Sequence, residues 1–139
     1  MTENNATVVH RWFQEIWNEG KLDAADQLLA PHGVCHGCGN FDFGEIRGPA
    51  EFKAYAVGLH RAFSNIRVQI EDTITEGDKV VVRFEVTMRH TGKLGMFEAT
   101  QKPVTIRGVS IARVENGKIV EGWNFWDQMG MVKTLEAAA

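Results

Sequence analysis

The segment Ile119–Gln128 carries the side chains best suited to chemistry in this sequence. If the segment is a strand, its alternation places Trp123, Phe125 and Asp127 on one face. A carboxylate at the end of an apolar wall is desolvated, which raises its pKa toward the range of a general base. Asp127 is therefore the first candidate catalytic residue, and Trp123 and Phe125 are candidate substrate contacts.

A structural role for Asp127 accounts for the same pattern. The residue lies near the end of its predicted strand, where a carboxylate can cap the backbone that follows or pair with an arginine. Carboxylates with perturbed pKa values also occur in structural networks. The pattern alone leaves both interpretations of Asp127 open.

A second group of reactive side chains lies within His32–Cys38, which contains two histidines and two cysteines. Four such side chains can form a tetrahedral zinc site, but zinc modules usually divide their ligands into two separated pairs. The spacing here favours a strand and loop at a pocket mouth, so no metal is predicted. His36 is a candidate catalytic partner for substrate or for Asp127, with a solvent-facing histidine as the alternative. Cys35 and Cys38 are expected to be reduced thiols without an assigned role.

Four further residues are candidate substrate contacts. Phe84 and Met88 belong to one apolar row of a predicted strand, and Ser110 is the polar residue on the predicted pocket face of another. Tyr55 lies on the apolar stripe of a predicted helix. Its hydroxyl could donate a hydrogen bond to a substrate oxyanion, or it could be satisfied within the core.

Three helices are predicted in the first half of the chain. Apolar residues recur with helical spacing over residues 8–17, and Gly20 then supplies a stop. A short second helix begins at Asp23 and ends at Pro31. The third helix extends over residues 48–63 and has a proline in its first turn.

Beyond Asn65 the hydrophobic period changes from helical to alternating, which predicts long strands in the second half. The first hairpin turns at Glu76–Asp78 and pairs Ile70 with Phe84 on its inner face. Helices followed by a meander of strands indicate an α+β fold, in which three N-terminal helices pack in a curved antiparallel or mixed sheet.

A second hairpin turns at Asn116-Gly117, a pair that favours the two-residue type I′ turn. If both strands are regular, this turn determines every partner and places small residues opposite large aromatic ones. The pairs on this face are Ser110 with Trp123, Gly108 with Phe125, and Ile106 with Asp127. The hollow between them is the predicted pocket. On the other face, Arg107 opposes Trp126 in a candidate cation–π contact.

Length and composition indicate one domain over residues 1–139, with mobile ends at 1–5 and 136–139. Hydrophobic residues make up 44% of the chain, which is enough for a core without disulfide or metal staples. The formal charge of −3 argues against nucleic acid as a partner. No signal sequence or membrane-length apolar run is apparent, so a cytoplasmic protein away from membranes is expected.

Two hairpin motifs resemble those of a known family. They read Ile70-Glu71-Asp72 with Glu76-Gly77-Asp78-Lys79-Val80, and Asn116-Gly117-Lys118-Ile119-Val120-Glu121 followed by Trp123-x3-Asp127-x2-Gly130. With three preceding helices, the chain resembles the SnoaL-like polyketide cyclases of the nuclear transport factor 2-like superfamily over nearly its whole length. The resemblance implies a cone-shaped α+β barrel. It also implies that Asp127 is the acid/base of an intramolecular aldol closure, without metal or organic cofactor.

Two functions are consistent with this resemblance. The first is a cofactor-free enzyme of cyclase, isomerase or lyase type, which uses general acid/base chemistry on a small apolar carbonyl compound. The second is a non-catalytic domain that binds a small apolar ligand. The second gains support because no other catalytic group is evident beside Asp127.

A homodimer is a further expectation. On the predicted outer face of the sheet, four residues form a mixed apolar and basic surface: Arg107, Val109, Ile111 and Trp126. An exposed tryptophan beside branched apolar residues commonly marks an interface. The resemblance points the same way, since members of this superfamily often pair through that face.

Overall fold

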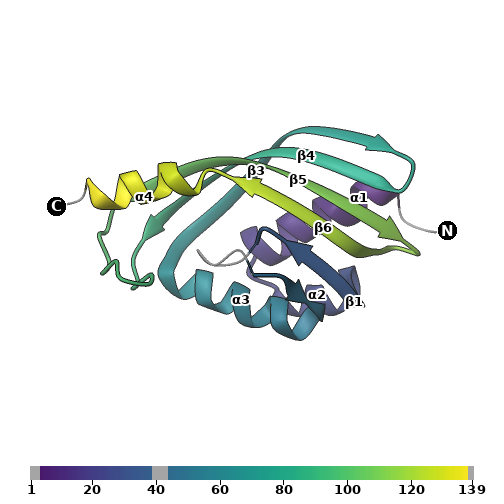
Figure 1. The fold of residues 1–139 in the computed structure, drawn as a ribbon, viewed down its shortest axis with the longest axis horizontal. Coiled ribbons are helices and arrows are strands. Elements are labelled where there is room, and N and C mark those ends of the chain that lie inside the picture. Colours follow the sequence, from purple (N-terminus) through teal and green to yellow (C-terminus); the bar gives the residue numbers. More distant parts are fainter. Residues whose placement is uncertain (1–3, 39–43, 138–139) are drawn as a thin grey trace.

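The computed structural model describes residues 4–38 and 44–137. Its helical elements are α1 (Asn5–Arg11), the π-helical η1 (Trp12–Asn18), the 3-10 helix η2 (Leu22–Ala24), α2 (Ala25–Leu28), α3 (Gly48–Ala62) and α4 (Gln128–Glu136). Its strands are β1 (Leu29–His36), β2 (Ile46–Arg47), β3 (Phe63–Glu76), β4 (Lys79–His90), β5 (Pro103–Glu115) and β6 (Lys118–Trp126). This order of elements confirms the predicted α+β fold (Figure 1).

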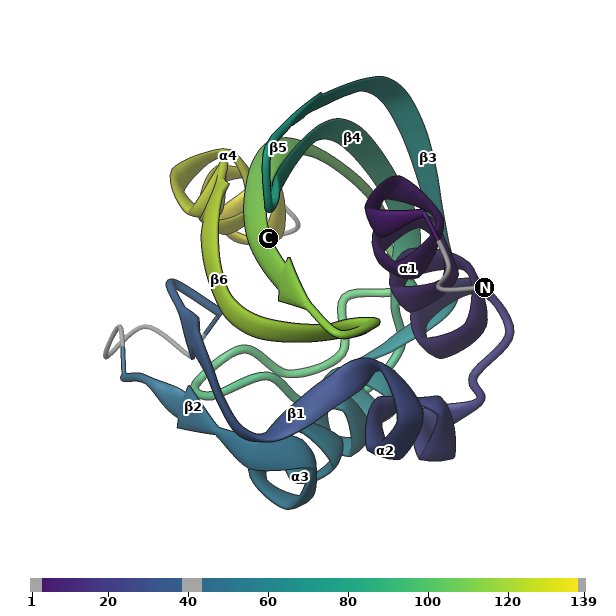
Figure 2. The ribbon, with the colours of Figure 1, turned by 90° about the vertical axis from the view of Figure 1, so that its right-hand side faces the viewer.

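The strands form one six-stranded mixed sheet in the order β2-β1-β6-β5-β4-β3. Neighbouring strands are antiparallel except β1 and β6, which run parallel. The long strands β3 to β6 curve strongly, and α1 and α3 border the space that they enclose (Figure 2). The sheet and helices together therefore give the cone-shaped architecture that the sequence resemblance implied.

The helices bury one apolar face each. Asn4 caps α1 by accepting a hydrogen bond from the Ala6 N–H at 2.8 Å. Along α1 and η1, the fully or nearly fully buried residues are Val8, Val9, Trp12, Phe13 and Ile16. In α3, Pro49 occupies the first turn as predicted, where its missing N–H costs no hydrogen bond.

The predicted end of the second helix is wrong. The helix stops at Leu28, and the chain from Leu29 onward already belongs to β1. Pro31 lies between Leu29 and Val34, where the pairing of β1 with β6 is irregular. A proline has no N–H to donate, so it is tolerated where the ladder is interrupted.

Helix α4 was not predicted, and it closes one end of the sheet. It is held there by Met131 and Leu135, which are both buried. Of the predicted mobile ends, residues 1–3 and 138–139 lie outside the described residues, whereas Asn5 begins α1 and Glu136 ends α4. Within the described ranges, none of the helices combines the length and apolar character needed to cross a bilayer.

The first hairpin has the predicted pairing of Ile70 with Phe84, but its turn is shorter than predicted and its first strand contains a bulge. Its turn contains two residues, because Glu76 pairs with Lys79. A bulge then separates Ile70 from Asp72, so that Ile70 still pairs with Phe84. Arg83 pairs with Asp72 and lies 3.7 Å from its carboxylate. The prediction made the turn one residue too long and omitted the one-residue bulge in the strand. These two errors cancelled, so the predicted pairing of Ile70 with Phe84 is still correct.

The second hairpin contains one bulge that reverses the predicted faces. Its turn is as predicted: Asn116 and Gly117 both have positive φ, and Glu115 pairs with Lys118. Val114 then pairs with Ile119 but Arg113 pairs with Glu121, so Val120 has no partner. The extra residue moves every later side chain of β6 to the opposite face.

The pairs predicted beyond this bulge are therefore wrong. Ser110 opposes Asn124 instead of Trp123, and Gly108 opposes Trp126 instead of Phe125. Asn124 and Trp126 face the interior, while Trp123 and Phe125 face outward. The predicted contact of Arg107 with Trp126 is wrong for the same reason, and Arg107 pairs instead with Glu85 at 2.9 Å.

His90 makes the stability of this fold sensitive to pH. It is fully buried, and burial lowers its pKa. Its Nδ1 lies 3.2 Å from the Thr100 amide nitrogen and 3.0 Å from the Thr100 hydroxyl oxygen, while its buried Nε2 has no hydrogen-bond partner in the described part of the chain. Among the described residues, no carboxylate pairs with the ring to compensate for a positive charge. Protonation of His90 is therefore less favourable in the folded protein than in the unfolded chain, which binds a proton below about pH 6.5.

We expect the free energy of unfolding to fall as the pH decreases from about 7.5 to 5.5, because the unfolded state then gains this proton more readily than the folded state. His90→Asn, which keeps an acceptor for Thr100, should be less stable overall but should lose most of this pH dependence. The exposed His32 provides the matched control, since His32→Gln should keep the wild-type slope. Urea denaturation across this pH range measures both; an unchanged slope in His90→Asn would contradict the assignment.

Candidate functional site

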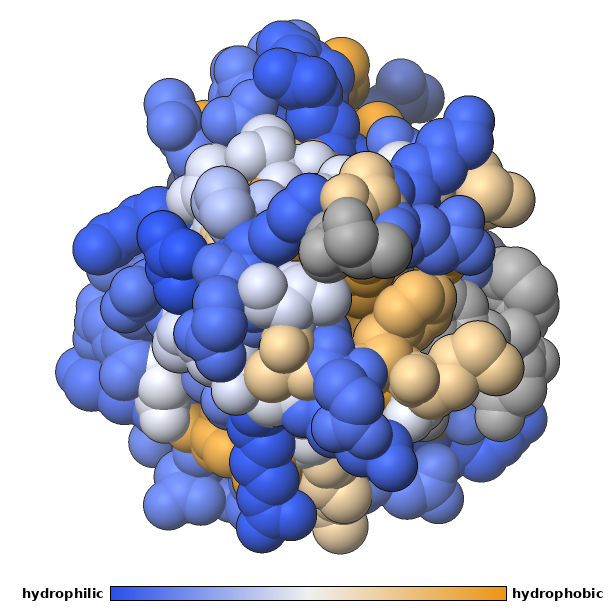
Figure 3. Space-filling view, turned by 90° about the vertical axis from the view of Figure 1, so that its left-hand side faces the viewer, coloured by the Kyte–Doolittle hydropathy of each residue, from blue (hydrophilic) through white to orange (hydrophobic). Residues whose placement is uncertain are grey.

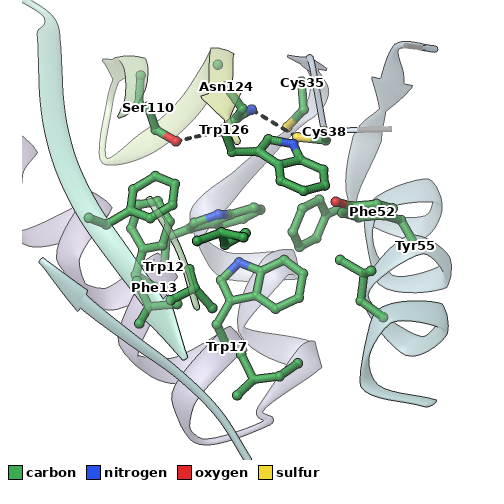
Figure 4. Close-up of a pocket in the computed structure, with 18 of the residues that line it drawn as sticks. Trp12, Phe13, Trp17, Cys35, Cys38, Phe52, Tyr55, Ser110, Asn124 and Trp126 are labelled. Carbon is green, nitrogen blue, oxygen red and sulfur yellow. Dashed lines mark hydrogen bonds between the residues drawn. The ribbon is translucent and has the colours of Figure 1, made fainter. Parts of the chain in front are cut away.

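A partly open cavity of about 160 Å³ lies between the concave face of the sheet and the helices. Residues from α1, η1, β1, α3, β3, β4, β5, β6 and α4 line it, and Figure 4 shows many of them. At the α4 end of the molecule, apolar side chains gather beside a hollow among polar ones (Figure 3). The volume of the cavity is close to that of engineered apolar cavities of about 150 Å³ that take up benzene. The cavity therefore suits a ligand with about one ring.

Aromatic side chains form much of the cavity wall. The rings of Trp12 and Phe52 lie 4.4 Å apart between centroids, and Trp17 meets Phe52 edge-on at 5.9 Å. Phe84 packs against Phe13 at 5.4 Å. Such rings offer a large apolar surface with few rotatable bonds, which favours flat apolar ligands.

A chain of hydrogen bonds crosses one side of the cavity. The Ser110 hydroxyl donates to Asn124 Oδ1 at 2.5 Å, and Asn124 Nδ2 donates to the His36 carbonyl at 3.0 Å. Because that carbonyl can only accept, it determines which way round the amide lies. Asn124 Nδ2 also lies 2.9 Å from Cys38 Sγ. The amide thus ties β5, β6 and the end of β1 together.

Gly37 allows the end of β1 to approach β6 this closely. Its φ is +73°, and a Cβ at this position would collide with the Asn124 carbonyl. Its own carbonyl accepts a hydrogen bond from Trp126 Nε1 at 3.3 Å. Gly37 therefore orients the indole of Trp126 along the cavity wall, as Figure 4 shows.

Tyr55 supplies a hydroxyl from α3 (Figure 4). Burial raises the pKa of Tyr55 well above its ordinary value, so the hydroxyl stays protonated. No hydrogen-bond partner for it is found among the described residues. Tyr55 can therefore act as a donor to a ligand, while deprotonation for use as a base is strongly disfavoured.

The cavity wall is poor in groups for acid/base chemistry. Among the described residues that line it, none is Asp, Glu, His, Lys or Arg. The titratable side chains in the wall are Cys35, Cys38 and Tyr55. Elsewhere in the described chain, no three His, Cys, Asp or Glu side chains are grouped so that they could hold a metal ion.

The predicted orientation of Asp127 toward the pocket is wrong. Asp127 is exposed and is the N-cap of α4, where its Oδ1 accepts a hydrogen bond from the Gly130 N–H at 2.8 Å. The bulge at Val120 contributes to this outcome, because it turns the face that carries Trp123 and Phe125 away from the cavity. Of the two interpretations that the pattern left open, the structure shows the capping role.

His36 also faces away from the cavity. Its Nε2 lies 2.7 Å from Glu121 and its Nδ1 lies 3.2 Å from Glu45. Its ring stacks on Trp123 at 5.8 Å, on the outer face of the sheet. The hydrogen bond to His36, with a smaller contribution from Arg113, lowers the pKa of Glu121. His36 therefore does not come near Asp127, contrary to prediction.

The remaining four predicted contacts do lie in the cavity wall, namely Tyr55, Phe84, Met88 and Ser110. That they touch a ligand stays a prediction. Trp123 and Phe125 do not line the cavity, and Phe125 is 61% exposed. Sequence reasoning missed Asn124 and Trp126. The available signal was the consecutive apolar pair Ile119-Val120, which interrupts the alternation of the strand.

The fold is that of ketosteroid isomerase-like and nuclear transport factor 2-like proteins. A Catenulispora acidiphila protein with a ketosteroid isomerase-like fold, solved in complex with trimethylamine, has a TM-score of 0.76 and 13% identity to this chain. That match covers 98% of this chain and 95% of the other. The sequence profile of the SnoaL-like polyketide cyclases matches residues 7–135. The chain belongs to this family, which confirms the resemblance seen in the sequence.

Two solved structures of candidate polyketide cyclases are similar to this chain over nearly their whole length. A candidate polyketide cyclase from Acidithiobacillus ferrooxidans has a TM-score of 0.84 and 22% identity, covering 100% of this chain and 99% of that one. IdmH from Streptomyces antibioticus, another candidate polyketide cyclase, has a TM-score of 0.82 and 21% identity, covering 96% and 99%. At these identities the likeness shows the fold alone. Among curated proteins, none matches the sequence significantly.

The capping role of Asp127 predicts a difference between two substitutions. Asp127→Ala removes the acceptor for the Gly130 N–H and should lower the free energy of unfolding by about 1 kcal/mol. Asp127→Asn keeps a capping oxygen and should change it by only a few tenths of a kcal/mol. Urea denaturation at neutral pH measures both. Equal losses in the two variants would show that the charge, and not the cap, is what stabilises α4.

Proposed function

We propose that this protein binds a small, largely apolar carbonyl compound in the cavity between its sheet and helices. The observation that carries the proposal is the composition of the described cavity wall, which has aromatic and aliphatic side chains but no carboxylate or imidazole. A preformed apolar cavity with a few polar groups is the usual form of a small-molecule site.

Tyr55 is the polar group best placed to recognise the ligand. The amide of Asn124 and the hydroxyl of Ser110 are already engaged with each other and with the end of β1. The Tyr55 hydroxyl is uncommitted among the described residues and stays protonated. A ligand carbonyl would satisfy this donor, while its ring would pack against Trp12, Trp17 and Phe52.

Catalysis in the same cavity is the second candidate function. Membership of a family named for polyketide cyclases favours it. Asp127 also lies immediately before Gln128, whose side chain lines the cavity. In this alternative Asp127 would leave its capping position when substrate binds and act as the general acid/base.

Two ligands of nearly equal shape test the role of Tyr55. We expect acetophenone, which carries a carbonyl, to bind more tightly than ethylbenzene, which does not. Tyr55→Phe should weaken the binding of acetophenone roughly fivefold, the effect of about one net hydrogen bond. The same substitution should leave the binding of ethylbenzene unchanged. Isothermal titration calorimetry with both ligands gives the four affinities.

The control for this experiment is Asp127→Asn, which should bind both ligands as the wild-type protein does. Equal losses for both ligands in Tyr55→Phe would mean that the hydroxyl does not contact the carbonyl. Exchange of the acetophenone methyl protons with deuterated water, catalysed by the wild-type protein and abolished in Asp127→Asn, would instead support the catalytic alternative.

We also infer that the outer face of the sheet forms a homodimer interface, through a corrected set of residues. Trp126 lines the cavity and therefore does not belong to the outer surface predicted for the interface. Val109 pairs with Phe125 and Ile111 pairs with Trp123, so strand alternation places these four side chains on the outer face, while Ile111 also borders the cavity. A cluster of partly exposed apolar side chains on a sheet is typical of an interface between copies of one chain.

Phe125→Glu should shift the protein from dimer to monomer, because it introduces a charge into the middle of an apolar contact. Ile74 is a matched control: it has the same 61% exposure but lies on β3, away from this surface. Ile74→Glu should leave the dimer intact. Light scattering at micromolar concentration measures the mass, and a wild-type monomer would rule out the interface.

A further inference from the structure

Two cysteines form a thiol pair in the cavity wall. Cys35 is an inward-facing residue of β1, and the positive φ of Gly37 turns the chain so that Cys38 returns to the same wall. Both side chains are buried, and the two thiols are close enough for each to shift the pKa of the other. Figure 4 shows the two sulfurs side by side at the edge of the cavity. The pair is therefore close in space as well as in sequence.

The surroundings of this pair differ from those of an inert core cysteine. Asn124 Nδ2 lies 2.9 Å from Cys38 Sγ, which makes this sulfur a hydrogen-bond acceptor. Interaction between the two thiols lowers the pKa of Cys35, and the same interaction together with burial raises the pKa of Cys38. The two sulfurs are thus unequal: the Asn124 amide occupies Cys38, so Cys35 carries the less engaged sulfur and is the one assigned the first attack.

The size and the apolar lining of the cavity limit which molecules can reach these thiols. They are buried and face an apolar space with room for about one ring, which favours small organic molecules over polar ones. In the proposed function, Tyr55 donates a hydrogen bond to the ligand carbonyl, and neither cysteine takes part. A pair of neighbouring thiols can undergo one reaction that neither can complete alone, namely closure to an intramolecular disulfide.

We propose that Cys35 and Cys38 are a reversible dithiol–disulfide site that is oxidised by small organic hydroperoxides entering the cavity. The proposal rests on the proposed function only in that the oxidant uses the same cavity as the ligand. The site is a place of covalent modification, separate from the hydrogen-bonding group Tyr55.

The reaction has two steps. The sulfur of Cys35 attacks the terminal oxygen of the hydroperoxide, so that an S–O bond forms, the O–O bond breaks, and the alcohol leaves with the thiol proton. The sulfur of Cys38 then attacks the sulfenic sulfur, so that the disulfide forms and the hydroxyl group leaves as water with the second proton. The two thiols are oxidised to one disulfide, and the hydroperoxide is reduced to one alcohol and one water.

Cumene hydroperoxide, which carries one aromatic ring, is the probe for this reaction. Stoichiometric addition to the reduced protein should lower its intact mass by two hydrogen atoms and remove both titratable thiols, and dithiothreitol should restore them. Oxidation by cumene hydroperoxide should be roughly tenfold or more faster than by hydrogen peroxide, because its ring is buried in the cavity. Excess acetophenone should slow it by competition.

Single substitutions separate the two cysteines. In Cys38→Ala, reaction should stop at the sulfenic acid of Cys35, which dimedone traps. In Cys35→Ala, dimedone labelling should be much weaker. Circular dichroism of both variants checks that they fold, and the wild-type mass measurement tests the proposal even if one variant does not.

Two results would overturn the proposal: no intramolecular disulfide with either oxidant, or hydrogen peroxide acting as fast as cumene hydroperoxide. These outcomes are distinguishable from failure of the proposed function. Acetophenone binding without disulfide formation would remove the thiol site alone. Disulfide formation without any acetophenone binding would remove the carbonyl-binding function and leave the thiol site in place.

Discussion

The chemistry of the cavity depends on one residue, Val120, which has no partner in the sheet. Strand side chains alternate between two faces, so a single unpaired residue exchanges the faces of everything beyond it. On β6 this exchange brings Asn124 and Trp126 inside and sends Trp123 and Phe125 outside. The bulge lies where β1 joins β6 in parallel, with Leu29 opposite Ile119 and Val34 opposite Glu121. The pairing with β1 is itself irregular at this point.

The contact between β1 and β6 also organises the polar part of the cavity. Asn124 reaches the His36 carbonyl and Cys38, and Trp126 reaches the Gly37 carbonyl, so the end of β1 is held against β6 by side chains from the inner face. The outer face of the same two strands carries the charged cluster around His36 and Glu121. Acidic and basic groups are thus sorted to the outside, and amide, hydroxyl and thiol groups to the inside. Buried neutral groups that bond one another cost far less than buried charges.

Because the charged groups lie outside the cavity, the fold alone does not determine which reaction, if any, the cavity supports. The chain belongs to a family named for polyketide cyclases, but the carboxylate that the sequence motif singles out caps a helix. What the described cavity offers is apolar surface, one uncommitted hydroxyl and two neighbouring thiols. These groups suit recognition of a small carbonyl compound and thiol chemistry. A cone-shaped barrel supports different functions because its lining can change while the sheet and helices keep their positions.

The sequence by itself determined the α+β class, the α1 and α3 segments, both hairpins and the positions of Tyr55, Phe84, Met88 and Ser110 in the cavity wall. Each of these follows from local periodicity or from a turn preference, which act over a few residues. Only the tertiary structure decided the faces of β6, the role of Asp127, the place of His36 and the meeting of Cys38 with Asn124. The bulge that controls them adjoins pairing with a strand about ninety residues earlier in the chain. The apolar pair Ile119-Val120 signals an interrupted alternation, but it does not specify this long-range contact, because strand alternation predicts a face only while the ladder stays regular.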